Sequence, residues 1–164
     1  MRFVKESVIN ASPDRVFDFH RRPEAFEMLI PPWENVKVLR KADITRVHSQ
    51  AIIEQKIFGL IPSRWVAEHT KYEHPHMFED VQVSGPFKSW RHRHFVELNP
   101  AGKTILRDEI EFEPPFGILG HFAAPFAILP KLERMFEYRH KVTKEFCEND
   151  KNYAHSYCLL EVQS

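Results

Sequence analysis

The sequence has no excess of charge of either sign. Among its 164 residues, Lys and Arg together number 23, and Asp and Glu also number 23. A protein that binds nucleic acid through phosphates usually has a basic excess or a basic face. The composition therefore gives no indication of a nucleic-acid partner.

Long apolar runs are also missing. No stretch reaches the roughly 20 consecutive apolar residues that cross a bilayer, so we expect no stable membrane insertion. The first ten residues, MRFVKESVIN, lack the apolar segment of a signal peptide. With only two cysteines, Cys147 and Cys158, nothing suggests a disulfide framework. These observations predict a cytoplasmic protein with two free thiols.

Several catalytic and cofactor-binding motifs are absent. There is no glycine-rich phosphate loop and no Gly-x-Ser-x-Gly pattern. Neither cysteine is a good candidate nucleophile, because Cys147 is expected at the end of a helix and Cys158 in the C-terminal tail. We therefore expect no cofactor.

The sequence is rich in phenylalanine, with 14 residues, and its 43% apolar content is ordinary for a globular protein. Large apolar side chains suit a core that lines a wide space. The chain has no internal repeat and no linker. We expect one domain over residues 1–148, followed by a tail, 149–164, whose role the sequence does not indicate.

The order of the predicted elements indicates an α+β fold. An opening strand covers 3–9, and Ser12, Pro13 and Asp14 mark the start of a helix. A second short helix covers 23–28, and a long helix is expected at about 126–148. Between them, turn residues separate six predicted strands: 35–40, 49–58, 63–73, 77–84, 88–98 and 103–113. We expect a curved antiparallel sheet of about seven strands around the long helix, with a cavity between them.

This pattern resembles the START-like, or SRPBCC, superfamily with its helix-grip fold. The stretches ASPDRVFDFH, RPEAFEMLIPPWENV, IPSRWVAEHTKYE, FEDVQVSGPFKSWRHRHF and MFEYRH are similar to a bacterial branch of cyclase/dehydrase-type, ligand-binding proteins. The resemblance covers about residues 3–146. It implies a ligand cavity without naming the ligand, and it implies an epimerase-like protein as a partner, since relatives are joined to or encoded near one.

The stretch GPFKSWRHRHFVE, residues 85–97, alternates between two kinds of side chain. In a strand, Trp90, His92 and His94 lie on one face and Arg91 and Arg93 on the other. Because arginines belong in water, the histidine face should be the concave one. A tight turn at 85–87 places Asp80 opposite His92 and Gln82 opposite Trp90, on the same face. A longer loop would instead pair Gln82 with His92 and keep the same face, so the register stays open.

Neighbouring elements add further polar candidates. On the strand 103–113, Asp108, Ile110 and Phe112 should point inward. On the strand 63–73, Lys71 suggests that its own face is the outer one, which sends Glu68 inward. On the long helix, Met135 and Arg139 lie on the inner side.

Three interpretations of this polar cluster stay open. Buried carboxylates need partners, so the groups can form a network that holds the sheet to the helix. They can also line a pocket and orient the polar end of an apolar ligand. Finally, His92-x-His94 with Asp80 or Glu68 offers metal ligands, but such a pair arises by chance in a chain with ten histidines. We expect no metal.

We favour a binding protein for a hydrophobic or amphipathic small molecule, such as a lipid, a polyketide or an isoprenoid. The expected ligand-binding residues are Glu68, Asp80, Gln82, Trp90, His92, His94, Asp108, Ile110, Phe112, Met135 and Arg139. One alternative is a cyclase- or dehydratase-type enzyme that uses His92 or His94 with Asp80 as acid or base. Another is a regulatory partner of a nucleotide-sugar-epimerase-like protein. The apolar segment GILGHFAAPFAIL could gate the cavity or simply pack under the long helix.

Overall fold

A computed structural model describes residues 1–57 and 61–149 and contains one seven-stranded sheet. The strands are β1 (Arg2–Ile9), β2 (Val36–Arg40), β3 (Gln50–Ile57), β4 (Ile61–Glu73), β5 (Met77–Ser84), β6 (Ser89–Leu98) and β7 (Thr104–Glu113). All neighbours are antiparallel, in the order β1-β7-β6-β5-β4-β3-β2. The helices are α1 (Pro13–Arg21), α2 (Ala25–Met28), α3 (Gly117–Ala127) and α4 (Leu129–Cys147).

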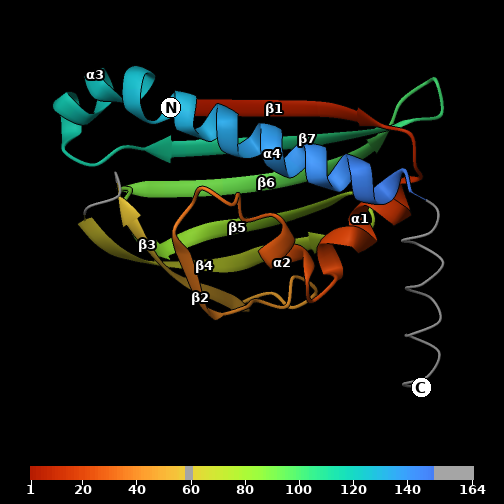
Figure 1. Ribbon diagram of the computed structural model, residues 1–164, viewed down its shortest axis with the longest axis horizontal. Coiled ribbons are helices and arrows are strands. Elements are labelled where there is room, and N and C mark those ends of the chain that lie inside the picture. The colour runs from red at the N-terminus through yellow and green to blue at the C-terminus, as the bar shows by residue number, and fades with distance from the viewer. Residues whose placement is uncertain (58–60, 150–164) are drawn as a thin grey trace.

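The expected α+β helix-grip architecture is confirmed (Figure 1). The sheet is curved, and α4 runs along the β1 side of one face, which we call the inner face. Helix α1 closes one end of that face. It begins as the sequence predicts, because Ser12 Oγ accepts a hydrogen bond from the backbone N–H of Arg15 at 3.3 Å and Pro13 occupies the first helical position.

The core consists of two apolar clusters on the inner face. The first lies at the α1 end and joins Phe17 and Phe19 of α1 to Val96 and Leu106 of the sheet. The second lies toward α3 and joins Phe3, Trp90, Ile110, Phe112, Leu132 and Phe136. The side chains at the centre of each cluster are buried. The part of the inner face between the two clusters carries polar groups.

The segment before α4 differs from the expectation. The long helix begins at Leu129 rather than at 126, and residues 117–127 form a separate helix, α3. Phe116 has a left-handed backbone with φ of 66°, which breaks the chain direction before α3. Simple packing under the long helix is wrong for this segment, because most of its large side chains are exposed.

No helix among the described residues is both long enough and apolar enough to cross a membrane. The C-terminal residues 150–164, for which the sequence indicates no role, lie outside the described residues.

Candidate functional site

A cluster of carboxylates and imidazoles lies on the inner face between the two apolar clusters. The strand register brings it together: His92 is opposite both Asp80 and Ile110, while His94 is opposite both Phe78 and Asp108. The predicted pairing of Asp80 with His92 and the inward direction of both histidines are therefore confirmed. His92 is almost fully buried, with 4% of its surface exposed.

Asp108 is the centre of the cluster. Its Oδ1 accepts a hydrogen bond from His92 Nε2 at 2.7 Å, and its Oδ2 lies 2.6 Å from His140 Nε2. His94 Nδ1 is also 2.7 Å from Asp108 Oδ1, but its N–H direction does not make a hydrogen bond. One buried carboxylate is thus shared by three imidazoles, which compensates for its removal from water.

Asp80 forms the second, more accessible side of the cluster. Its Oδ2 lies 3.5 Å from both His92 Nδ1 and His94 Nε2. The side chains of Asp80 and His94 are 17% and 13% exposed, whereas that of Asp108 is 5% exposed. His94 also stacks on Phe78, with ring centroids 3.9 Å apart. A molecule approaching the cluster would therefore meet Asp80 and His94 first.

The charges of the cluster follow from these contacts. Burial lowers the pKa of His92, but hydrogen bonds to Asp108 and Asp80 outweigh burial and raise the pKa to about 9. Burial raises the pKa of Asp80 and Asp108, but the surrounding histidines outweigh it and hold both pKa values well below the ordinary one. At neutral pH, His92 is therefore an imidazolium between two carboxylates.

The structure adds three histidines that the sequence analysis missed. His140 of α4 bonds to Asp108 and lies 2.9 Å from Ser7 Oγ, which ties α4 to β1 and β7. His140 follows Phe136, on the inner side of the predicted helix, by four residues, and this spacing indicates that it lies on the same side. His69 lies opposite Asp80, and its Nδ1 is buried without a hydrogen-bond partner in the described part of the chain. His20 lies beside His94, and burial, followed by His94 itself, lowers the pKa of His20 to about 4.

The inward placement of Glu68 is wrong. Glu68 lies opposite Val81 on the outer face, and its carboxylate binds His48 Nδ1 at 2.9 Å and Gln50 Nε2 at 2.8 Å. The cause is a β-bulge between His69 and Lys71, which puts one extra residue into β4 and reverses the alternation. His69 and Lys71 are two residues apart and would share a face in a regular strand, but here His69 points inward and Lys71 outward.

Gln82 has a structural role. Its amide donates to Phe87 O at 2.7 Å and accepts from the Phe87 N–H at 3.3 Å, which closes the turn between β5 and β6. A Cβ on Gly85 would lie 2.4 Å from Gln82 Oε1, so a side chain at this position would displace the Gln82 amide from the turn. The Gln82 side chain is thus committed to the turn.

The expected outer face is only partly confirmed. Arg91 is 54% exposed, but Arg93 is 26% exposed and lies between Glu109 and Glu111. Glu109 is itself buried, with 8% of its surface exposed. Arg93 is therefore part of an ion-pair network on the outer face and does not simply extend into water.

The other predicted ligand residues lie in different surroundings. Ile110, Phe112 and Trp90 are buried in the second apolar cluster, and Met135 is half-buried at its margin. Arg139 does not contact the carboxylates directly. Its Nε donates to Leu29 O at 3.2 Å, and burial lowers its pKa while Asp108 and Asp80 oppose that effect.

Asp80, His92 and His94 could also offer metal ligands, since one atom from each lies within 4.8 Å of the others. Two imidazoles and a carboxylate are a donor set that suits zinc. However, both ring nitrogens of His92 face carboxylates, and its pKa of about 9 keeps it protonated at neutral pH. A metal would have to displace that proton. The absence of a metal remains a prediction.

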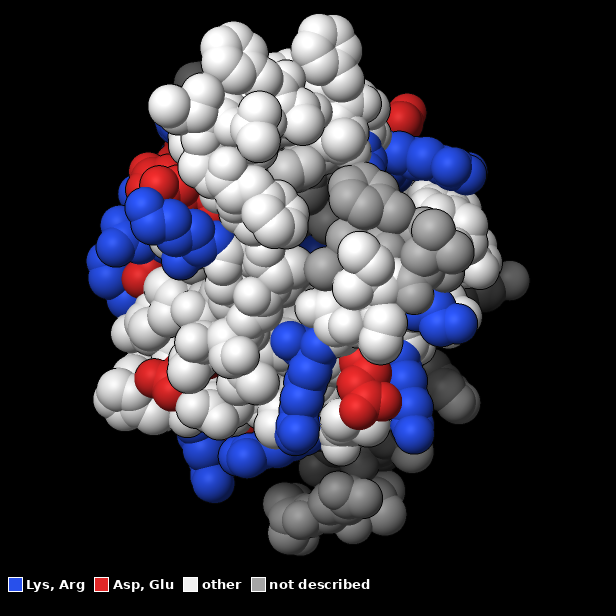
Figure 2. Space-filling view, turned by 90° about the vertical axis from the view of Figure 1, so that its left-hand side faces the viewer, with Lys and Arg blue, Asp and Glu red and all other residues white. Residues whose placement is uncertain are grey.

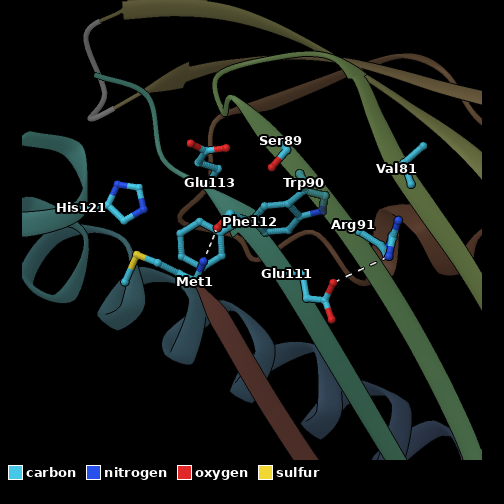
Figure 3. Close-up of a pocket in the computed structure, with 9 residues that line it drawn as sticks. All are labelled: Met1, Val81, Ser89, Trp90, Arg91, Glu111, Phe112, Glu113 and His121. Carbon is cyan, nitrogen blue, oxygen red and sulfur yellow. Dashed lines mark hydrogen bonds and ion pairs between the residues drawn. The ribbon is translucent and has the colours of Figure 1, made fainter. Parts of the chain in front are cut away.

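Two pockets stand out among the described residues. One, of about 580 Å³, opens at the α3 end of the sheet between Trp90, Phe112, Met1 and His121 (Figure 3). Figure 3 shows the Met1 amino group bonded to Phe112 O and Arg91 paired with Glu111 beside it. The other, of about 310 Å³, lies along β1 and α4 and includes Ser7 and His140. Neither is an enclosed cavity between sheet and helix.

The architecture is that of START-like proteins of known structure. The chain is similar to the protein TTHA0849 of Thermus thermophilus (TM-score 0.68, 15% identity, 88% of this chain and 95% of that one). A START superfamily protein from Mycobacterium smegmatis has a TM-score of 0.64 and 14% identity, covering 90% of this chain and 97% of its own. A nucleoside-diphosphate sugar epimerase from Corynebacterium glutamicum has a TM-score of 0.63 and 23% identity, covering 87% of this chain but only 28% of its own.

The chain belongs to the polyketide cyclase / dehydrase and lipid transport family, whose model matches residues 9–135. No curated protein matches the sequence. The family and the fold agree with the resemblance seen in the sequence.

The first prediction concerns the two faces of β6. His92→Ala leaves the carboxylates of the cluster without their charged partner, and we expect a loss approaching the roughly 3–5 kcal/mol of a broken buried pair. Asp80→Ala should cost less, because Asp80 is partly exposed. Arg91→Ala, on the outer face, should stay within about 0.5 kcal/mol. Chemical denaturation measures all three, and a larger loss for Arg91→Ala than for His92→Ala would contradict the assignment of faces.

The second prediction concerns pH. The pKa of His92 is raised in the folded state, so its stabilisation is complete below about pH 6.5 and is lost as pH rises through 9. The lowered pKa of His20 acts oppositely, since the unfolded chain binds more protons between about pH 4 and 6.5. Stability should therefore peak near pH 6.5. In urea denaturation from pH 5 to pH 9.5, His92→Gln should flatten the alkaline decline and the exposed His48→Gln should not. An unchanged slope in His92→Gln would disprove the assignment.

Proposed function

We propose that the chain binds a hydrophobic or amphipathic small molecule, such as a lipid, a polyketide or an isoprenoid, on the inner face of the sheet. Membership of a family described by polyketide chemistry and lipid transport supports the proposal. The observation that carries it is an apolar half of the inner face that α4 does not cover, next to the accessible side of the Asp80–His94 pair.

The uncovered half lies over β2, β3 and β4. Val38, Ile53 and Trp65 are directly opposite one another on these strands and form an apolar strip. All three are half-buried, and no residue of β2, or of β3 from Gln50 to Lys56, is fully buried. Helix α4 packs along β1, at the other edge of the sheet. The strip is therefore a surface that an apolar ligand can cover without displacing the packed core.

The connection between α2 and β2 reaches over to α4 and borders this strip. Trp33 packs edge-on against Tyr138 with ring centroids 5.3 Å apart, and Glu34 pairs with Lys131 at 3.1 Å. The hydrogen bond from Arg139 to Leu29 O adds a third link. Figure 1 shows α2 and this connection in front of β4 and β5. These links give the proposed site a wall opposite the sheet.

Polar groups at one end of the strip would orient the ligand. Asp80 and His94 are the accessible members of the charged cluster, and the guanidinium of Arg139 is held near them by the bond to Leu29. A ligand with an apolar body and one polar end would place that end at these groups. Its apolar body would then lie between the strip and Met135 of α4.

The third prediction tests this site. Met135→Arg places a charge on α4 where the apolar body of the ligand would lie, and we expect it to weaken binding of a fluorescent fatty acid by about ten-fold or more, since roughly 1.4 kcal/mol already gives that factor. Val83→Arg changes an exposed apolar residue of β5 in the same way and should bind as the parent does. Fluorescence titration measures both. Equal affinity for a folded Met135→Arg variant would rule out the proposed site.

A second candidate function is a cyclase- or dehydratase-type reaction, which the family description includes. The specific observation in its favour is the position of His92 between Asp80 and Asp108, which raises its pKa and suits it to act as a hydrogen-bond donor or general acid at neutral pH. It does not suit the base role considered from the sequence.

The fourth prediction separates the two functions. A binding protein returns its ligand unchanged, so mass spectrometry of a polyketone substrate recovered after incubation should show no loss of water and no new isomer. A product that forms with the parent protein and not with His92→Gln would instead establish the enzyme.

An epimerase-like partner is a separate proposal, and it keeps the third function open, that of a regulatory partner. Its support is the similar fold unit that makes up 28% of the Corynebacterium glutamicum epimerase chain. We propose the cytoplasm as the compartment of action, where the buried thiol of Cys147 would remain reduced.

A further inference from the structure

Helix α3 exposes an unusual set of large apolar side chains. The exposed fractions are 85% for Phe116, 75% for Ile118, 77% for Leu119, 74% for Phe122 and 86% for Phe126. At 100° per residue, the last four share one side of the helix. A soluble domain normally turns such a side toward its core.

The opposite side of α3 carries small residues and fixes the helix in this orientation. Gly120, Ala124 and Ala127 face the rest of the protein, and Ala124 is fully buried. A Cβ on Gly120 would lie 1.8 Å from Pro115 O, so the backbone approaches too closely for any other residue. Rotating α3 to bury its large side chains would expose Ala124 and put Phe or Leu side chains where small residues now pack. The apolar side is therefore held outward.

The whole segment 114–130 contains no Asp, Glu, Lys or Arg. Its only ionisable side chain is His121, which bonds to Gly117 O at 3.0 Å. Figure 2 shows the result as a continuous uncharged surface at the α3 end of the molecule, with charged side chains around its margin. Nothing on the helix would have to lose a charge or an ion pair on entering an apolar phase.

The margin carries lysines that can reach lipid phosphates. Lys88, in the turn between β5 and β6, is 66% exposed, and Lys131, in the first turn of α4, is 46% exposed. Each pairs with a glutamate, so the net attraction to an anionic surface is modest. Ile61, at the start of β4, adds another exposed apolar side chain with 59% of its surface exposed.

A second copy of the chain fits this surface less well than a lipid surface does. An 11-residue helix is about 16 Å long, so two such sides would bury well under the roughly 1,200–2,000 Å² of a stable protein interface. Protein interfaces also contain about one hydrogen bond per 100–200 Å². The outward side chains of Ile118, Leu119, Phe122 and Phe126 offer no hydrogen-bonding group.

We propose that α3 docks the protein on a lipid surface. The helix is too short to span a bilayer, so it lies in the interfacial plane with its apolar side among the upper acyl chains, as interfacial helices do. The lysines at the margin remain at the level of the headgroups. The open pocket beside Trp90 and Phe112 adjoins this surface through His121. This inference stands independently of the proposed ligand site.

The fifth prediction tests docking by sedimentation with vesicles, one set of phosphatidylcholine and one with roughly 30% phosphatidylglycerol. On the anionic vesicles, each lysine at the margin can add at most about 1 kcal/mol to the binding free energy. We expect the protein to sediment with both sets, and more strongly with the anionic one. The double variant Phe122→Gln/Phe126→Gln should lower the partition coefficient by about ten-fold or more. The control Val47→Gln/Leu98→Gln removes two exposed apolar side chains elsewhere and should partition as the parent does.

Two results would overturn the proposal once circular dichroism has shown that the variants are folded. One is a parent protein that stays in the supernatant with both vesicle sets. The other is a Phe122→Gln/Phe126→Gln variant that sediments as well as the parent. Analytical ultracentrifugation adds a decisive outcome: a dimer that this variant converts to monomer, without vesicle binding, would show that a second copy covers α3.

Discussion

The shared carboxylate of Asp108 organises the inner face. It lies on β7 and is contacted by His92 and His94 of β6 and by His140 of α4, which continues to Ser7 of β1. Three elements are thereby fixed to one point by charge-assisted contacts, which are the stronger class of hydrogen bonds. A buried charge without such partners would cost several kcal/mol, so the cluster and the packing of α4 on the sheet depend on each other.

This constraint divides the inner face into two regions with different properties. On the β1, β7 and β6 side, α4 is held down and the apolar side chains are buried. On the β2 to β4 side, no described residue of these strands makes such a contact with α4, and the apolar strip around Trp65 is only half-buried. The same interaction that stabilises one half of the fold leaves the apolar strip on the other half only half-buried.

Much of the arrangement could be predicted from local sequence. Residues of a strand alternate between two faces, so the pattern around Trp90, His92 and His94 was sufficient to place the histidines inside and Arg91 outside. Ser12 and Pro13 were sufficient to start α1. Alternation failed at Glu68, because a bulge at Thr70 adds one residue and no composition rule marks it. His140 was missed because helical spacing shows which side of α4 a residue lies on, but not whether a histidine there binds a carboxylate.

The sequence by itself determined the order of the seven strands and of α1, α2 and α4, and the alternation that gathers the polar side chains, because each depends on neighbours within a few residues. The structure was needed to choose between the two possible registers of the β5–β6 hairpin. Only the tertiary structure decided which imidazoles share Asp108, which half of the inner face α4 leaves uncovered, and that α3 turns its phenylalanines outward. These outcomes depend on contacts between residues distant in the chain, such as the bond from His140 to Asp108, and on the burial of Ala124 against the rest of the protein. An apolar helix has the same sequence pattern whether its partner is the protein's own core or something outside it.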